Sequence, residues 1–206
     1  MDTLHREDLY LSVKSYQTER LRTTYADFAA QEEWKDVCWF FFERVYNTED
    51  TRTRDAGMQR LHHHLDRFLG GDVVRCLGAI IKLQQLTIQL DLKLVADLRI
   101  LQAPVTFDLI QYEQAYRMGN NYQARIDQIE VLVDALQQGF RLFQRFGIGA
   151  ALKALHRFQK LRGDALVTGF LVEAHDILTE LNEITPLVQA IETRERERLD
   201  RIYQFG

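Results

Sequence analysis

The chain has 206 residues, of which 46% are hydrophobic and 27% charged, and a formal net charge of −4. This length supports one substantial core, so we expect a single domain over residues 1–206, with the composition of a globular protein and not of a disordered one. Acidic residues outnumber basic residues by 30 to 26. The positive field that a polyphosphate backbone requires is therefore lacking, and no nucleic acid is expected as a partner.

Nothing in the sequence has the pattern of a secretory signal or a membrane segment. The N-terminal stretch MDTLHREDLYLSVK lacks an apolar signal-peptide core, and no window of about 18 apolar residues free of charge occurs. We therefore expect a cytoplasmic protein with no membrane partner. Cys38 and Cys76 lie within apolar helical patterns, which predicts two free thiols and neither a disulfide nor a zinc site.

Apolar residues recur at spacings of three and four almost throughout, and no strictly alternating segment competes with them. The sequence therefore predicts an all-α, bundle-like fold of about eight to nine helices with no β-sheet. The expected helices span residues 6–30, 33–46, 53–69, 73–101, 106–118, 122–146, 148–162, 165–182 and 186–204. The first of them is either part of the bundle or an appendage to it. The Gly119-Asn120-Asn121 and Thr185-Pro186 stretches mark two of the breaks between helices.

The expected helix 122–146 carries a seam of apolar residues alternately three and four apart. Its members are Ile126, Ile129, Val133, Leu136, Phe140 and Phe143. Such a seam faces the core of the bundle or, as the alternative, a second copy in a homodimer. The last helix pairs Glu192 with Arg196 and Glu197 with Arg201 at i,i+4, which is typical of a solvated face.

Asp91 is the polar residue in the most unusual position. On a helical wheel of residues 73–101 it points to the apolar face, away from Lys82, Gln85, Gln89 and Lys93. An unpaired carboxylate there would cost on the order of several kcal/mol, so Asp91 needs a cation or several donors. The first candidates are arginines: Arg54, Arg117 and Arg125. Two roles stay open, a ligand-facing carboxylate between helices and a buried ion pair that fixes helix register.

The histidines do not form a metal-binding pattern. His62, His63 and His64 are consecutive, and neighbours on a helix point about 100° apart, so the three cannot converge on one ion. His156 and His175 flank apolar stripes. They are interpreted as boundary histidines, with a haem ligand or a general base as the alternative. No metal and no cofactor is predicted.

No motif of a common enzyme class occurs. Gly147 and Gly149 form a G-x-G, but no strand precedes it and a third glycine is missing, so it is interpreted as a helix junction. The G-x-S-x-G, G-x-x-x-x-G-K and H-E-x-x-H motifs are absent, and with them the commonest signals of hydrolases, nucleotide-binding proteins and zinc proteases. The catalytic residues, if any, stay unknown.

Residues 40–46, FFFERVY, end an aromatic run and are followed by Arg54-Asp55. This stretch resembles the bacterial protein family named for an FFLEELY motif, and the similarity extends over about residues 35–205. Further positions that carry it are Leu90-Asp91, Tyr116-Arg117, Arg125 and Arg194-Glu195. Arg44 stands where the family has a second glutamate, which weakens a paired-glutamate site. That family has no assigned activity, so the resemblance implies a fold and a shared polar cluster but no function.

The expected function is a non-enzymatic binding or protein-interaction module with a protein partner or a homodimer, because no catalytic set can be assembled. The alternative is an enzyme that binds a small molecule or cofactor in a polar pocket around Asp91, Tyr116 and Arg117. The candidate cluster comprises Glu43, Tyr46, Arg54, Asp55, Asp91, Tyr116, Arg117 and Arg125. A cavity walled by these side chains would favour the alternative, and a large exposed apolar patch would favour a protein partner.

Overall fold

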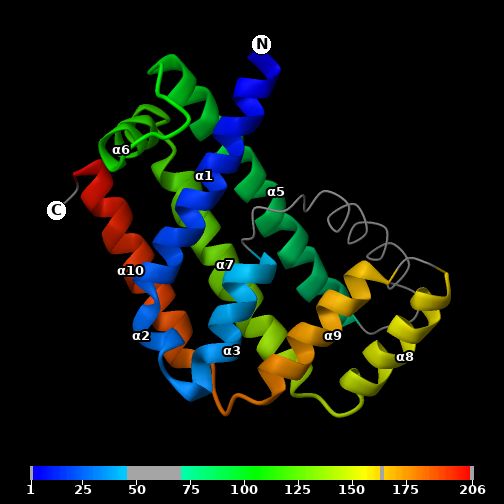
Figure 1. Ribbon diagram of the computed structural model, residues 1–206. Helices are drawn as coiled ribbons and strands as arrows, with labels where there is room; N and C mark the ends of the chain where they lie inside the picture. The colour runs from blue at the N-terminus through cyan, green and yellow to red at the C-terminus, as the bar shows by residue number, and fades with distance from the viewer. Residues whose placement is uncertain (1, 46–70, 163–164, 205–206) are drawn as a thin grey trace.

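The structure is a computed structural model that describes residues 2–45, 71–162 and 165–204. Every regular element in these ranges is a helix, which confirms the all-α prediction (Figure 1). The elements are α1 (Asp2–Thr24), α2 (Ala26–Ala29), α3 (Glu32–Phe40), the π-helical turn η1 (Phe41–Val45), α5 (Gly71–Ile100), α6 (Leu109–Met118), α7 (Tyr122–Phe143), α8 (Ile148–Leu161), α9 (Leu166–Thr179) and α10 (Thr185–Tyr203). The predicted helix 53–69, with His62, His63 and His64, lies outside the described residues.

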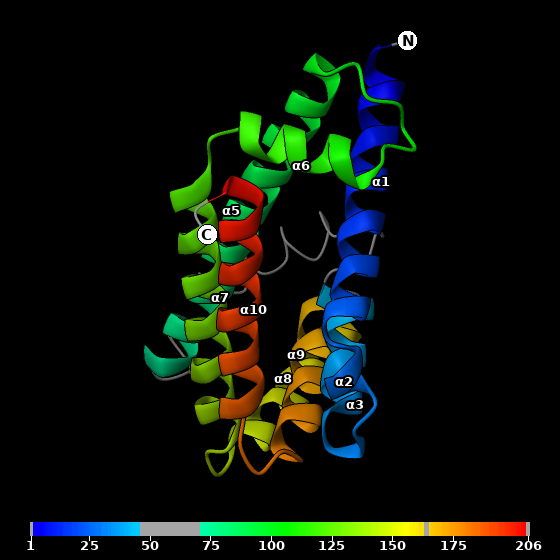
Figure 2. The same cartoon turned by 90° about the vertical axis from the view of Figure 1, so that its left-hand side faces the viewer.

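Helices α7 and α10 lie side by side, and α1 runs along the opposite side of the molecule (Figure 2). Helix α5 packs against both α7 and α1, and α6 packs against α5 and α10 near one end. At the other end α8 and α9 form a helical hairpin that contacts α7 and α3. The long helices therefore enclose an interior to which α1, α5, α7 and α10 all contribute.

The buried apolar side chains form three clusters. The first joins α1, α5, α6, α7 and α10, and α1 adds to it Leu9 and Val13, both fully buried. The second joins α3 and α5 to the α8–α9 hairpin. The third joins the end of α1, α2 and α3 to α7 and α10. The seam of α7 faces these clusters, since Ile126, Ile129 and Leu136 are buried; the homodimer stays a prediction.

The predicted helix 6–30 is kinked at Tyr25, where α1 ends and α2 begins. Arg194 of α10 donates hydrogen bonds to Thr24 O at 2.6 Å and to the two carboxylate oxygens of Asp27 at 2.8 and 2.6 Å. This bidentate arginine hydrogen-bonds a helix carbonyl at the kink and ties α1 and α2 to α10. The same hydrogen bonds lower the pKa of Asp27.

The predicted helix 33–46 is α-helical only as far as Phe40 and continues as the π-helical turn η1. A π-turn holds one more residue per hydrogen-bonded ring than an α-turn, which changes the direction in which the following side chains point. Phe40 is buried with its ring 5.0 Å from that of Phe170. Phe41 and Phe42 line the interior cavity described below. The π-turn thus lets Phe40 pack into the second apolar cluster while the adjacent Phe41 and Phe42 line the cavity.

Tyr203 fastens the end of α10 to the turn between α6 and α7. Its hydroxyl donates to Tyr116 O at 2.9 Å and accepts from Asn121 N at 3.1 Å. The turn itself needs a left-handed residue, and Asn120 supplies it with φ 47°, as the Gly-Asn-Asn stretch predicts. Two backbone groups, one in the last turn of α6 and one in the connection to α7, therefore depend on a single side chain.

We expect Tyr203→Phe to lower the free energy of unfolding by about 1–3 kcal/mol, because both backbone groups lose their partner in a part-buried place. The measurement is urea denaturation followed by circular dichroism. Tyr122→Phe is the matched control, since the Tyr122 hydroxyl donates to the carboxylate of Asp200 at 2.7 Å, a group that water can solvate. Equal losses for the two variants would contradict this account of the turn.

Candidate functional site

A cavity of about 100 Å³, partly open to solvent, lies between α1, α3, η1, α5, α6, α7 and α10. It separates the first apolar cluster, which supplies Leu199 and Ile129 to its wall, from the third, which supplies Leu21 and Leu187. The polar side chains on which its chemistry depends are Gln17, Arg20, Asp91, Tyr116, Arg125 and Arg198. The wall thus consists of apolar side chains with a few charged side chains among them.

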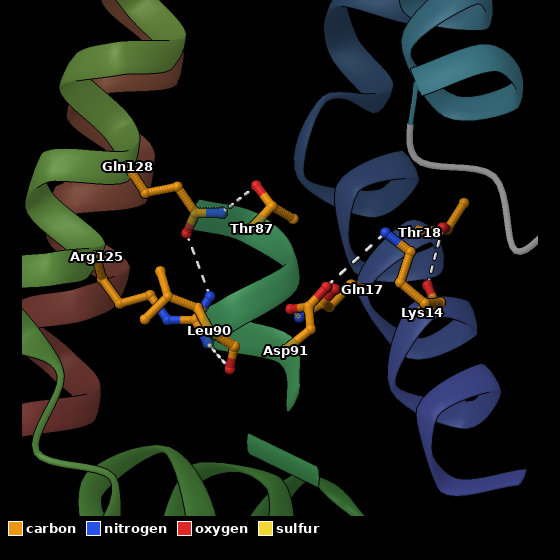
Figure 3. Close-up of polar contacts among 8 residues, drawn as sticks. All are labelled: Lys14, Gln17, Thr18, Thr87, Leu90, Asp91, Arg125 and Gln128. Carbon is orange, nitrogen blue, oxygen red and sulfur yellow. Dashed lines mark hydrogen bonds and ion pairs between the residues drawn. The ribbon is translucent and has the colours of Figure 1, made fainter. Parts of the chain in front are cut away.

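Asp91 is fully buried on α5 and faces α1 (Figure 3). Gln17 Nε2 donates to its Oδ1 at 2.9 Å, and Lys14 Nζ lies 3.8 Å from its Oδ2. That Oδ2 accepts no hydrogen bond from any described residue. This oxygen is enclosed beside the Lys14 ammonium group and has almost no surface open to the cavity.

The prediction that an arginine pairs with Asp91 is wrong for Arg117 and Arg125, and Arg54 lies outside the described residues. The cation is Lys14, because α1 runs along α5 at the level of Asp91. Arg125 instead reaches the neighbouring backbone, donating from Nη2 to Leu90 O at 3.2 Å. The buried carboxylate was correctly located from its helix face, but the cation beside it, Lys14 of α1, was not among the predicted partners.

Arg125 is a buried cation, 5% exposed, held by neutral groups (Figure 3). Besides Leu90 O it donates to Gln128 Oε1 at 3.2 Å, and Gln128 donates in turn to Thr87 Oγ1 at 2.7 Å. Its guanidinium lies 4.5 Å from the centre of the Tyr116 ring. No described carboxylate forms an ion pair with it. A positive charge thus stands in the wall with no counter-ion among the described residues.

Arg198 adds a second guanidinium beside the same aromatic rings. Its centre lies 5.2 Å from the Tyr116 ring and 5.6 Å from the Tyr112 ring. Burial lowers the pKa of Arg198, but the Tyr112, Tyr116 and Glu195 side chains together raise it by more. The guanidinium therefore stays charged. Burial also raises the pKa of Tyr112, which keeps that phenol protonated as a hydrogen-bond donor.

A third arginine, Arg20, is paired within the wall. Its Nη1 lies 2.5 Å from Glu195 Oε1, which also accepts from the Tyr25 hydroxyl at 3.1 Å. Its buried Nε donates to no described acceptor. Two side chains that line the cavity therefore have a polar atom without a hydrogen-bond partner among the described residues. These atoms are the donor Arg20 Nε and the acceptor Asp91 Oδ2.

The structure brings together only part of the predicted polar cluster. Asp91, Tyr116 and Arg125 line the cavity. Arg117 faces the end of α10, donating to Ile202 O at 3.2 Å, and Glu43 is half-buried in an ion pair with Arg22 of α1. Of the remaining candidates, Tyr46, Arg54 and Asp55 lie outside the described residues.

Several cavity residues were not identified from the sequence, among them Gln17, Arg20, Tyr112 and Arg198. Arg198 lies in a run of alternating arginine and glutamate that reads as a solvated helix face. Only part of this run is a solvated face. Glu192 does pair with Arg196, at 3.3 Å, but Arg201, which was expected to pair with Glu197, pairs with Glu113 of α6 at 2.8 Å. The spacing of four between Tyr112 and Tyr116 was the one available signal, because it places both rings on one face.

The described wall carries groups suited to binding and none arranged for nucleophilic catalysis. Cys38 lines the cavity, but burial raises its pKa to about 11, so the thiol stays protonated. Both remaining described histidines of interest lie at the α8–α9 hairpin. His156 forms a hydrogen bond with Thr168 at 3.1 Å, and His175 forms one with Asp176 at 3.0 Å. Within the described ranges no three His, Cys, Asp or Glu side chains gather as a metal site.

We expect Cys38 and Cys76 to stay unmodified when the folded protein is treated with a maleimide at pH 8, because burial raises the pKa of each to about 11. Mass spectrometry should show two additions only after denaturation. Between pH 9 and pH 11 each thiol keeps its proton in the folded state, whereas the unfolded thiol, with its ordinary pKa of 9.0, loses it. The free energy of unfolding should therefore fall as the pH rises from 9 towards 11. Rapid native labelling would contradict the burial of both thiols.

In a comparison with protein families, residues 2–205 match a family described as "Domain of unknown function (DUF8198)". No similar protein was found among curated proteins or among solved structures. The match spans all the helices described above, α1 included. None of the described helices is long and apolar enough to cross a membrane.

Proposed function

The chain belongs to the DUF8198 family, a domain of unknown function, and we propose that it binds a small molecule in the cavity between α1, α5, α7 and α10. One observation carries the proposal: Arg125 lines the cavity, is only 5% exposed, and is hydrogen-bonded only to neutral groups among the described residues. Buried charges in folded proteins are normally paired, and the exceptions call for a ligand or an ion.

The cost of these groups supports a binding role. A buried charged group with incomplete hydrogen bonding destabilises a core, and apolar residues of similar size are often as stable or more so. Stability alone therefore does not explain Asp91 and Arg125 in one wall. A water takes about 30 Å³ of liquid volume, so a cavity of about 100 Å³ has room for a compact molecule of a few non-hydrogen atoms.

The aromatic stretch that resembles the FFLEELY motif is connected with this site. Phe41 and Phe42 from that stretch line the cavity, which supports a link between the motif and ligand binding. A bacterial origin and a cytoplasmic location stay predictions. Binding without catalysis is favoured over the enzyme, because Cys38 is held as a thiol and the described wall contains no histidine.

The test is native mass spectrometry of the full chain purified from its own host. We expect a mass above that of the polypeptide, lost on denaturation and much reduced in Arg125→Gln. Arg141→Gln is the matched control, because Arg141 is exposed on α7. A bare polypeptide mass for the wild-type protein would overturn the proposal.

A protein-interaction module is the second candidate, and exposed apolar side chains favour it. Phe158 and Leu161 on α8 are 52% and 88% exposed, and Phe146 and Leu166 beside that helix are exposed as well. Apolar surface of this kind is typical of a protein-binding site. Sedimentation of wild type and Phe158→Ser tests the homodimer: association that the substitution abolishes supports it, and a monomer at every concentration would count against it.

A further inference from the structure

Helix α8 has two apolar faces, of which only one is covered by the described residues. Its inner face packs against α9 and contributes the buried Leu152 to the second apolar cluster. The helix lies at the edge of the molecule (Figure 1), and its outer face carries a second set of apolar side chains, all of them exposed: Ala150, Ala154, Phe158 and Leu161. Residues spaced three and four apart follow one side of a helix, so these side chains form a continuous outer stripe.

The outer stripe has the shape of a helix-packing surface. Ala150 and Ala154 are small, so the backbone of a second helix can come close to them, while Phe158 and Leu161 project from the next turns. Side chains of different size interdigitate in this way where two helices pack with their axes about 8–10 Å apart. Alanine adds little apolar area for insertion into a lipid surface, and binding to lipid scales with that area. The stripe therefore favours a helical protein partner over a membrane.

The charged residues beside the outer stripe are all basic. Helix α8 contains no Asp or Glu, in a chain whose net charge is −4. Lys153 pairs with Asp176 of α9 at 2.9 Å. Arg157, Lys160 and the C-cap Arg162 are exposed, and no carboxylate of the described part of the chain forms an ion pair with them.

These basic residues border the stripe on both sides. On a helical wheel Arg157 and Lys160 lie on one side of it and Arg162 on the other. The guanidinium of Arg162 lies 4.6 Å from the centre of the Phe158 ring. An arginine stacked on a ring keeps the N–H groups at its edge available to a carboxylate. The surface thus combines an apolar centre with a positively charged border.

A second copy of this chain is a poor match for the outer stripe. In a two-fold contact through α8 the same surface of each copy meets itself. Arg157, Lys160 and Arg162 would then share one contact with their own counterparts, without a carboxylate in α8 to separate them. Like charges brought together across an interface oppose association. The charge of the stripe's border therefore favours an acidic partner.

From these observations we infer that the outer stripe binds an α-helix of another protein, one whose apolar seam is bordered by Asp or Glu. The seam packs on Ala150, Ala154 and Phe158, and the carboxylates pair with Arg157 and Lys160. This inference rests on the second candidate function, the protein-interaction module, and names the chemistry of its partner. It does not depend on the cavity.

The test is fluorescence anisotropy of the full chain with two labelled helical peptides of about three heptads, each with leucine along its seam. One peptide has glutamate beside the seam and the other has lysine. We expect the glutamate peptide to bind at least about tenfold more tightly than the lysine peptide, with an affinity that falls as salt is raised. Equal affinities for the two peptides, or binding of neither, would overturn the inference.

Substitutions on α8 test where the peptide binds. Lys160→Glu should weaken binding of the glutamate peptide by about tenfold and strengthen binding of the lysine peptide. Phe158→Ser should weaken binding of both, because it removes the largest apolar side chain of the stripe. Lys35→Glu is the matched control, since Lys35 is an exposed lysine on α3, and it should leave both affinities within about twofold. Unchanged affinities in Lys160→Glu would overturn the inference, provided circular dichroism shows the variant folded.

Other occupants of the stripe would give different results. Tighter binding to phosphatidylglycerol vesicles than to the glutamate peptide would assign the stripe to a membrane surface and overturn the inference. A dimer in sedimentation that Phe158→Ser abolishes would also overturn it, but would leave the interaction module standing. Arg125→Gln, which removes the charge that the cavity proposal needs, should not change peptide binding, so failure of the small-molecule proposal is seen separately.

Discussion

Asp91→Ala should lower the free energy of unfolding by about 3 kcal/mol. The substitution removes the carboxylate that pairs with Lys14 and accepts from Gln17, and leaves both polar groups in the contact between α1 and α5. The side chain of Lys14 is only 12% exposed, so water cannot fully replace the lost partner. Chemical denaturation at neutral pH measures the effect.

A double-mutant cycle shows whether the loss comes from this pair. We expect Lys14→Met combined with Asp91→Ala to cost at least about 1 kcal/mol less than the sum of the two single substitutions. Asp36→Ala, which removes an exposed carboxylate from α3, should change stability by less than about 0.5 kcal/mol. Additive single effects, or an unchanged stability of Asp91→Ala, would contradict the buried pair.

Gly149→Ala should destabilise the protein by about 2 kcal/mol, through overpacking between α8 and α9. A Cβ at this position would lie 2.5 Å from His175 Cε1 and 2.6 Å from Nε2. The His175 ring cannot easily move away, because it packs against Phe143 with ring centres 5.5 Å apart and is bonded to Asp176. Thermal and urea denaturation measure the loss.

The sign of this effect should reverse when His175 is shortened. In a His175→Ala background the space beside Gly149 opens, and the same Gly149→Ala change should stabilise by up to about 1 kcal/mol, since alanine is the better helix former. Gly71→Ala, where a Cβ would meet nothing within 4 Å, is the control for propensity alone. The same loss in both backgrounds would show that the His175 contact is not the cause.

The helical fold was predictable because its signal is local. Apolar residues three and four apart place one face of each segment in the core, and the described helices follow that pattern from α1 to α10. The burial of Asp91 was predictable for the same reason, since a single helix fixes which face a residue occupies. The bends were less predictable: the kink at Tyr25 depends on Arg194 of α10, a contact between distant parts of the chain.

The candidate site was only partly predictable, because it is assembled from seven elements. Asp91 and Arg125 were identified, but Lys14 was not recognised as the cation near Asp91, since sequence does not show which helix lies against α5. Arg198 resembles its solvated neighbours in composition and differs from them only in facing the Tyr112 and Tyr116 rings. Such a difference depends on packing, and helix periodicity alone does not decide it.

The most direct test of the central claim is a crystal structure of the full chain purified from its own host, at a resolution that shows ordered water. The binding proposal predicts electron density for a molecule larger than water in the cavity, within hydrogen-bonding distance of the Arg125 guanidinium. A cavity that contains only water, or that is filled by the side chains of its own wall, would contradict it.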